Sequence, residues 1–257
     1  MKKVLILLAA VCAVSVLAES TVLKVIDFET SEGYQPGNLK GQNGWTWDYS
    51  KDECNQVVND PTFTPSGSQY YGMIKDGSDG ARGRVTFDIS SSFKAGNKLL
   101  ISWLSAGSAD GTHYAKFHNL GTTGERYNVE MFELQIYGNT VALNVSKEDK
   151  SGTQGIMKYG LVNPTDFHEV SVLVDPANKT IKEYTFDGEV LFDGSTTLYY
   201  KNEASGQTKA GQGGNLIDGV RLQGYGAFDG FKVEMVPEPA FFGLLALLGL
   251  FFARKQR

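Results

Sequence analysis

Three aromatic side chains alternate along one short polar stretch and could bind a sugar ring. Trp45, Trp47 and Tyr49 are separated by single residues in the run WTWDY, so on an extended chain they share a face. A flat aromatic surface edged by hydrogen-bonding groups suits the C–H face of a sugar, and Asn43 and Asp48 could supply those groups. The same aromatics could instead pack beneath a loop as core, and the sequence leaves both interpretations open.

A second chemistry to consider is hydrolysis of a glycosidic bond, which needs two carboxylates about 5–10 Å apart. On a strand only residues at even spacing share a face. The nearest pair in the chain is Glu130-Met-Phe-Glu133, whose odd spacing predicts opposite faces. The chain also lacks the GxSxG, HExxH, CxxC and P-loop patterns. We therefore predict no catalytic residues and a protein that is not an enzyme.

The histidines and cysteines offer little further chemistry. His113 and His118 are five residues apart, an odd spacing on a strand that argues against a shared zinc ion. Cys54 is the one cysteine outside the N-terminal leader described below. It cannot form an intrachain disulfide, so burial of a core must hold the body together.

The elements that must position these residues are predicted to be strands. Short β-branched and aromatic runs recur between clusters of Gly, Asn, Asp and Ser, and helical periodicity is nearly absent. The predicted strands cover 21–28, 84–89, 98–104, 112–118, 129–137, 140–146, 168–175, 179–186, 189–194, 216–224 and 227–236.

Turn residues between these strands predict two hairpins, at Tyr137-Gly-Asn-Thr140 and at Asp175-Pro-Ala-Asn-Lys179. So many closely spaced strands, with 30 glycines, favour an all-β fold, a single β-sandwich or jelly roll over 19–235. The segments 33–82 and 195–214 are expected to be long loops.

The first 18 residues predict a signal peptide. Two lysines precede an apolar run that ends in Val-Leu-Ala, so we expect export by the Sec machinery and cleavage by signal peptidase after Ala18. Without 1–18 and 237–257, which hold five of the 24 Lys+Arg and one of the 29 Asp+Glu, the body has a net charge near −9. Such an acidic body is a poor partner for nucleic acid.

The last residues, 236–257, predict a membrane segment. An apolar run at 240–253 is 14 residues long, about 21 Å as a helix. Arg254, Lys255 and Arg257 follow it and are expected to stay cytoplasmic, which places the body outside. Pro237 and Pro239 flank Glu238 and keep the preceding chain extended.

Two segments, IDFETSEGYQPGNLKGQNGWTW (26–47) and DFHEVSVLVDPANKTIKEYTFDGEVLFDG (166–194), resemble laminin-G-like and concanavalin A-like jelly rolls. Phe167 and Phe186 depart from the usual pattern of that family. The resemblance implies a fold and not an activity. His168 is expected to cap a strand or to hydrogen-bond a neighbouring backbone group, and Asp187-Gly188 to form a tight turn.

The same resemblance implies a structural calcium ion where the first and last strands meet. Asp27, Glu29 and Asp229 would be its side-chain ligands, since Ca²⁺ takes hard oxygen donors. These residues could equally be solvated carboxylates at the edge of the sheet.

The third familiar segment is IDGVRLQG followed by FDGFKVEMVPEP, and the order of Pro-Glu-Pro, apolar helix and basic end resembles a PEP-CTERM sorting signal. That resemblance implies an exosortase-type processing enzyme as partner and a final place at the cell surface or in the extracellular matrix. We expect a non-catalytic protein that binds or organises extracellular polysaccharide. The alternatives are a structural matrix or envelope protein that self-associates and a divergent glycoside hydrolase.

Overall fold

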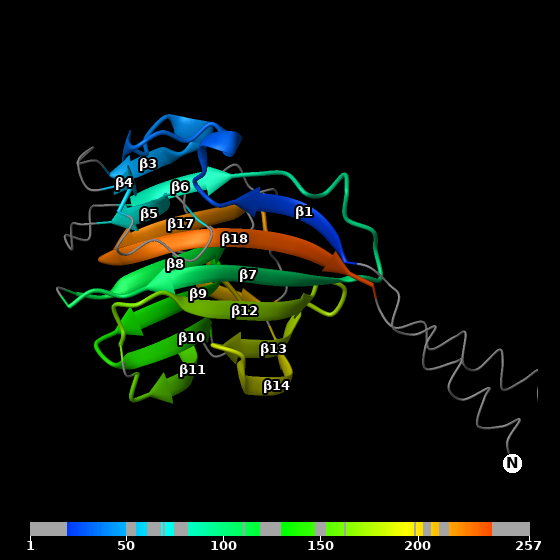
Figure 1. Ribbon diagram of the computed structural model, residues 1–257. Helices are drawn as coiled ribbons and strands as arrows, with labels where there is room; N and C mark the ends of the chain where they lie inside the picture. The colour runs from blue at the N-terminus through cyan, green and yellow to red at the C-terminus, as the bar shows by residue number, and fades with distance from the viewer. Residues whose placement is uncertain are drawn as a thin grey trace, which may run out of the picture.

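The chain folds into two antiparallel sheets that pack face to face (Figure 1). The computed structural model describes residues 20–49, 55–60, 68, 70–74, 82–109, 111–118, 130–146, 153–161, 163–197, 199–202, 207–210 and 216–237. Two short 3₁₀ turns, η1 (Thr30–Glu32) and η2 (Gln42–Gly44), interrupt the strands near the N-terminus.

The first sheet has nine strands. In spatial order they are β14 (Glu189–Thr197), β13 (Thr180–Phe186), β12 (His168–Asp175), β7 (Lys98–Ala106), β18 (Gly226–Val236), β5 (Tyr71–Ile74), β4 (Asn55–Val58) and β2 (Gly37–Asn38), with β1 (Thr21–Ile26) also paired to β18.

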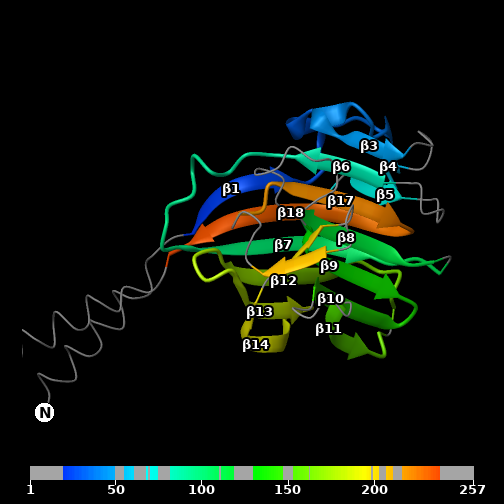
Figure 2. The ribbon, with the colours of Figure 1, turned by 180° about the vertical axis from the view of Figure 1, so that it is seen from behind.

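The second sheet, seen from behind in Figure 2, also has nine strands. Its main order is β11 (Thr153–Tyr159), β10 (Thr140–Ser146), β9 (Glu130–Tyr137), β8 (His113–His118), β17 (Gly219–Gly224), β6 (Arg82–Thr86) and β3 (Thr46–Tyr49). The hairpin of β15 (Tyr199–Asn202) and β16 (Gln207–Ala210) joins it through β9.

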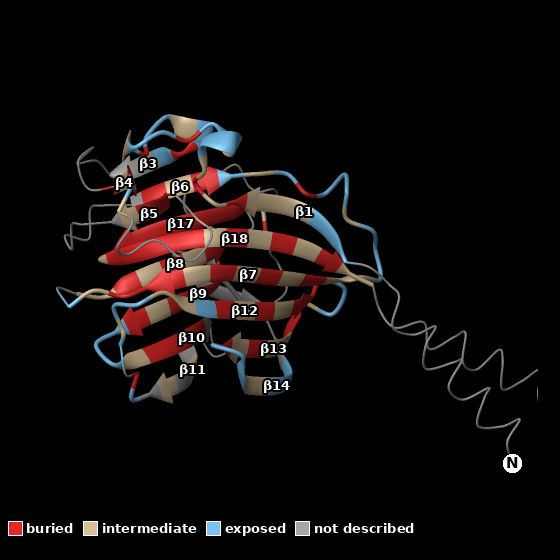
Figure 3. Cartoon of the chain, in the orientation of Figure 1, coloured by how far each residue is buried: buried red, intermediate tan, exposed pale blue. Residues whose placement is uncertain are grey.

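The core lies between the sheets, where alternate residues of each strand point inward (Figure 3). Val170, Val172 and Val174 of β12 are each 0 % exposed, because alternate residues of a strand share a face. Burial of each valine stabilises the fold by about 1.5–3 kcal/mol. Opposite them, the Phe117 ring lies 4.4 Å from that of Trp103.

All the strands predicted from the sequence are present, and both predicted hairpins are confirmed by β9–β10 and β12–β13. The predicted loop at 33–82 contains β2, β3, β4 and β5, and the predicted loop at 195–214 contains β15 and β16. β11 was also not predicted. β2, β4, β5, β15 and β16 are two to four residues long, too short for an alternating pattern to stand out.

The two ends of the body meet, because Thr21 of β1 pairs with Met235 of β18. Pro237 follows β18 directly, and the C-terminal end of β18 lies at the right of the two sheets in Figure 1. The predicted leader, the apolar run 240–253, and the residues Glu238, Pro239, Arg254, Lys255 and Arg257 lie outside the described residues. Within the described part of the chain, neither 3₁₀ turn is long and apolar enough to cross a membrane.

Candidate functional site

A two-residue turn positions the most chemically distinctive cluster. Asp187 and Gly188 join β13 to β14, with φ angles of +49° and +74°. A two-residue hairpin of this type needs positive φ at both positions, which Asp-Gly supplies readily. The predicted tight turn is confirmed, and it places the Asp187 carboxylate beside the first residue of β12.

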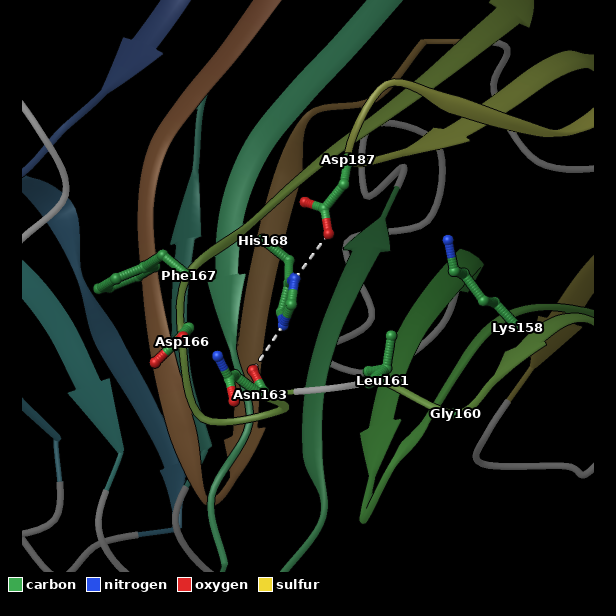
Figure 4. A pocket seen from close by; sticks show the side chains of 8 residues that line it. All are labelled: Lys158, Gly160, Leu161, Asn163, Asp166, Phe167, His168 and Asp187. Atoms are coloured by element: carbon green, nitrogen blue, oxygen red, sulfur yellow. Dashed lines mark hydrogen bonds and ion pairs between the residues drawn. The ribbon is translucent and has the colours of Figure 1, made fainter.

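That first residue, His168, uses both of its ring nitrogens (Figure 4). Nδ1 lies 2.8 Å from Asp187 Oδ2 and Nε2 lies 2.9 Å from the carbonyl oxygen of Asn163. The ring also stacks on Phe186, with centroids 4.9 Å apart. Both partners are acceptors, so each ring nitrogen bonds its partner when that nitrogen carries a hydrogen. The predicted bond to a neighbouring backbone group is confirmed.

A cavity of about 440 Å³ opens beside this histidine. It is lined by Lys158, Gly160, Leu161, Asn163, Asp166, Phe167, His168 and Asp187 (Figure 4). Lys158 comes from β11 of the second sheet and pairs with Glu189 on β14 of the first, so the cavity lies where the two sheets approach. We call it the hairpin pocket.

Polar groups of the hairpin pocket remain available to a ligand. The side chains of Asn163 and Asp166 are exposed and make no hydrogen bond within the described part of the chain. An amide, a carboxylate and the nearby Lys158 ammonium can together donate to and accept from several hydroxyl groups. A concave site with a few converging polar groups is the usual form of a small-ligand site.

The structure contradicts the predicted aromatic surface at Trp45, which is buried. Trp45 is 1 % exposed, its indole Nε1 donates to the Tyr34 hydroxyl at 2.9 Å, and its ring lies 5.9 Å from that of Phe28. Trp45 is therefore a core residue, as the alternative interpretation predicted, and it cannot stack on a ligand. The η2 turn directly before it directs the ring inward.

The remaining aromatic members of that surface stay a prediction. Trp47, Asp48 and Tyr49 lie in β3, and their side chains are outside the described residues. The pairing of β3 with β6 shifts register between Trp47 and Tyr49. Asn43 is exposed, but its Nδ2 donates to the Glu32 carbonyl at 2.9 Å and supports the loop.

The strand that carries Glu130 and Glu133 is irregular between them, unlike the regular strand that the prediction assumed. β9 pairs Glu133 with Lys116 and Glu130 with His118, and one extra residue of β9 lies between the two pairs. A bulge of this kind locally disrupts the ladder. Glu133 forms an ion pair with Lys116 at 2.9 Å, while the Glu130 side chain is outside the description. The absence of catalysis therefore stays a prediction.

The three predicted calcium ligands lie close enough to influence one another. Asp229 is 0 % exposed, and burial raises the pKa of its carboxyl to about 7. The charges of Asp27 and Glu29 add to this rise in pKa, while the Ser68 hydroxyl and the Gly230 amide oppose it. Those two groups do not reach normal hydrogen-bond geometry, since neither Asp229 oxygen has a partner of that kind within the described structure.

These carboxylates fit a calcium ion only in part. Asp27 Oδ1 is also buried without a hydrogen-bond partner in the described structure, but Glu29 Oε1 accepts from the Tyr70 amide at 3.2 Å. Across the described residues, no three or more Asp, Glu, His or Cys side chains are arranged to hold a metal ion. A calcium ion would need carbonyl or water oxygens as well.

Comparison with known proteins supports the fold. No protein-family model matches the chain, and no curated protein sequence does. Among solved structures, the chain is similar to a carbohydrate esterase from the Shiga toxin-encoding bacteriophage phi24B, with a TM-score of 0.51, 12 % identity, and 86 % of this chain and 100 % of that chain covered. At that identity the likeness shows the fold alone.

Two further solved structures with lower TM-scores are named as carbohydrate-binding domains. One is the carbohydrate-binding module CBM66 from Bacillus subtilis, with a TM-score of 0.41, 9 % identity, and 74 % of this chain and 95 % of that chain covered. The other is the carbohydrate recognition domain of Emp47p, with a TM-score of 0.40, 12 % identity, and coverage of 86 % and 98 %. Both TM-scores lie below 0.5.

Proposed function

We propose that the protein is exported and sorted to the cell surface, where its β-sandwich binds or organises extracellular polysaccharide without catalysis. The observation that carries this proposal is the hairpin pocket, whose volume of about 440 Å³ falls in the range of small-ligand sites. Its exposed amide and carboxylates suit the hydroxyl groups of a sugar unit. Engagement of both His168 nitrogens favours binding over proton transfer.

The position of the hairpin pocket fits a protein held at a surface by its C-terminus. His168 pairs with Ser105 near one end of β7, whereas Val236 pairs with Lys98 at the other end. These two positions are seven residues apart on β7, about 23 Å. A membrane segment after Pro237 would leave the pocket at the far end, facing outward.

Removing the exposed polar groups of the pocket is expected to weaken polysaccharide binding. Asn163→Ala combined with Asp166→Ala removes side chains that hold no part of the fold, so binding should fall roughly tenfold with no change in melting temperature. Affinity electrophoresis against a panel of polysaccharides measures this. Asp193→Ala, an exposed carboxylate on β14 outside the pocket, is the matched control. If the double variant and the control bind polysaccharide equally well, the hairpin pocket is not the binding site.

Sorting is proposed to depend on the Pro-Glu-Pro motif and the segment after it. An extended peptide just outside the membrane is accessible to a processing enzyme, and sorting signals of this order have an apolar tail that is removed. Pro237→Ala with Pro239→Ala is expected to leave the precursor uncleaved and held in the membrane. Cell fractionation and intact mass measure this, and normal processing of the double variant would contradict the proposal.

A structural calcium ion near Asp229 and Asp27 is proposed as well, supported by their buried oxygens without hydrogen-bond partners in the described structure. Adding Ca²⁺ should then raise the melting temperature, and EDTA should lower it, because a ligand that binds the folded state stabilises it. An unchanged melting temperature in both conditions would mean that the site holds no calcium.

A further inference from the structure

The charges that line the hairpin pocket are paired, with Asp166 as the exception. Lys158 forms an ion pair with Glu189 at the edge of the pocket. His168, when it is protonated, faces the Asp187 carboxylate at 2.8 Å. The Asp166 side chain is exposed, and within the described part of the chain it has neither an ion pair nor a hydrogen bond. The pocket therefore presents one negative charge that no described cation offsets.

The backbone around Asp166 fixes where this charge lies. The Asp166 amide donates to the Asn163 carbonyl at 3.0 Å, which closes a tight turn just before β12. The Gly107 amide donates to the Pro164 carbonyl at 2.9 Å and ties this turn to the residue after β7. His168 Nε2 lies 2.9 Å from the same Asn163 carbonyl. Because the turn is already ordered, binding at Asp166 would cost little backbone entropy.

Asp187 adds acceptor capacity on the other side of His168, as Figure 4 shows. Its Oδ2 lies 2.8 Å from His168 Nδ1, and its Oδ1 accepts from the Glu169 amide at 3.0 Å. A carboxylate can accept about four hydrogen bonds, and the Asp187 side chain is 44 % exposed. Asp187 can therefore accept from a ligand as well, while Asp166 supplies the charge that is not offset.

The charge of the whole body acts in the same direction. Its net charge is near −9, and an acidic body attracts cations and repels anions. A ligand ammonium that donates to a carboxylate forms a charge-assisted hydrogen bond, roughly twice as strong as a neutral one. A ligand with hydroxyl groups alone would bring no opposite charge to Asp166. The pocket is thus suited to a sugar that carries both an amine and hydroxyl groups.

We propose that the hairpin pocket prefers a polysaccharide with free amino groups and binds an ammonium group at Asp166. The inference rests on the proposed function, polysaccharide binding, and names the class of sugar that this pocket takes. The Asn163 side chain and Asp187 are placed to bond neighbouring hydroxyls. A uronic acid polymer would bring a carboxylate against Asp166 and bind less tightly.

The test compares three oligosaccharides of equal length by calorimetry with the full-length chain at about pH 5.5, where sugar amines are protonated. They are a chitosan oligomer, the cellulose oligomer, which has the same linkage and a hydroxyl in place of each amine, and an oligogalacturonate. We expect the chitosan oligomer to bind at least about tenfold more tightly than the cellulose oligomer, and the oligogalacturonate to bind most weakly. Added salt should reduce the difference.

A charge-removing variant tests the assignment to Asp166. Asp166→Asn keeps the size of the side chain and an acceptor oxygen but removes the charge, so the preference for the chitosan oligomer over the cellulose oligomer should fall to about twofold or less. Asp193→Asn removes the same charge from an exposed position on β14 outside the pocket and should keep the preference. Melting curves check that both variants fold.

Three results would overturn the inference while leaving the proposed function in place. They are equal or weaker binding of the chitosan oligomer relative to either other oligomer, an equal loss of the preference in both variants, and binding of an amine-free polysaccharide by a chain that does not bind the chitosan oligomer. A folded chain that binds none of the three oligomers and no other polysaccharide would count against both.

Discussion

In calcium-free buffer, Asp229→Asn is expected to stabilise the protein relative to wild type more at alkaline pH than at acidic pH. Burial raises the folded-state pKa of Asp229 to about 7 from a reference value of 3.8. The folded protein therefore binds the extra proton between these values, and the stability that Asp229 contributes is full below about pH 4 and is lost as pH rises through about 7. The difference in free energy of unfolding between variant and wild type should grow by about 2–3 kcal/mol from pH 5 to pH 8.

The wild type alone would hide this effect, because His113 titrates in the opposite direction. Burial lowers the pKa of His113 to about 4 from 6.5, so its stability is lost as pH falls through that window. The two contributions nearly cancel between pH 5 and pH 6.5. Urea unfolding of both proteins across the pH range separates them. Parallel pH profiles in calcium-free buffer would contradict the raised pKa of Asp229. A variant that is less stable than wild type at pH 8 only when Ca²⁺ is present would show that Asp229 coordinates the ion.

Trp45→Ala is expected to cost about 3–5 kcal/mol of stability. The side chain is 1 % exposed and packs among aromatic rings, with the Phe28 ring 5.9 Å away. Truncation removes buried apolar area, leaves a cavity, and deprives the Tyr34 hydroxyl of its indole donor. Chemical denaturation measures the loss of stability.

Two controls separate packing from ligand contact at this position. Trp45→Phe keeps most of the buried ring and should recover more than half of the lost stability. Tyr137→Ala removes an aromatic side chain that is 65 % exposed and should have little effect. Unchanged stability in Trp45→Ala together with loss of polysaccharide binding would restore Trp45 as a ligand contact.

The fold could be predicted where its signals are local. The strand predicted at 168–175 and the tight turn predicted at Asp187-Gly188 depend on neighbouring residues alone, and both are confirmed. Bulges could not be predicted, because the register shifts in β9 and β3 are set by the partner strand. These two shifts interrupt the regular strands that the predictions for Glu130 and for Trp47 and Tyr49 assumed.

The candidate sites, like the fold, could be predicted from the sequence only where they depend on neighbouring residues. His168 and Asp187 were identified from the sequence as structural residues, but their place in a pocket depends on Lys158, which arrives from the other sheet. The second sheet depends on β17 lying between β6 and β8, a pairing across more than 100 residues of sequence. No short sequence pattern encodes such a pairing, since the paired strands are far apart in the chain.

The most direct test of polysaccharide binding is a glycan array with the purified full-length chain, followed by calorimetry on any ligand found and by light scattering at several protein concentrations. We predict saturable binding to at least one extracellular polysaccharide by a folded chain whose particle size does not grow with concentration. A folded chain that binds nothing on the array and grows in size with concentration would contradict this function and favour a structural matrix protein.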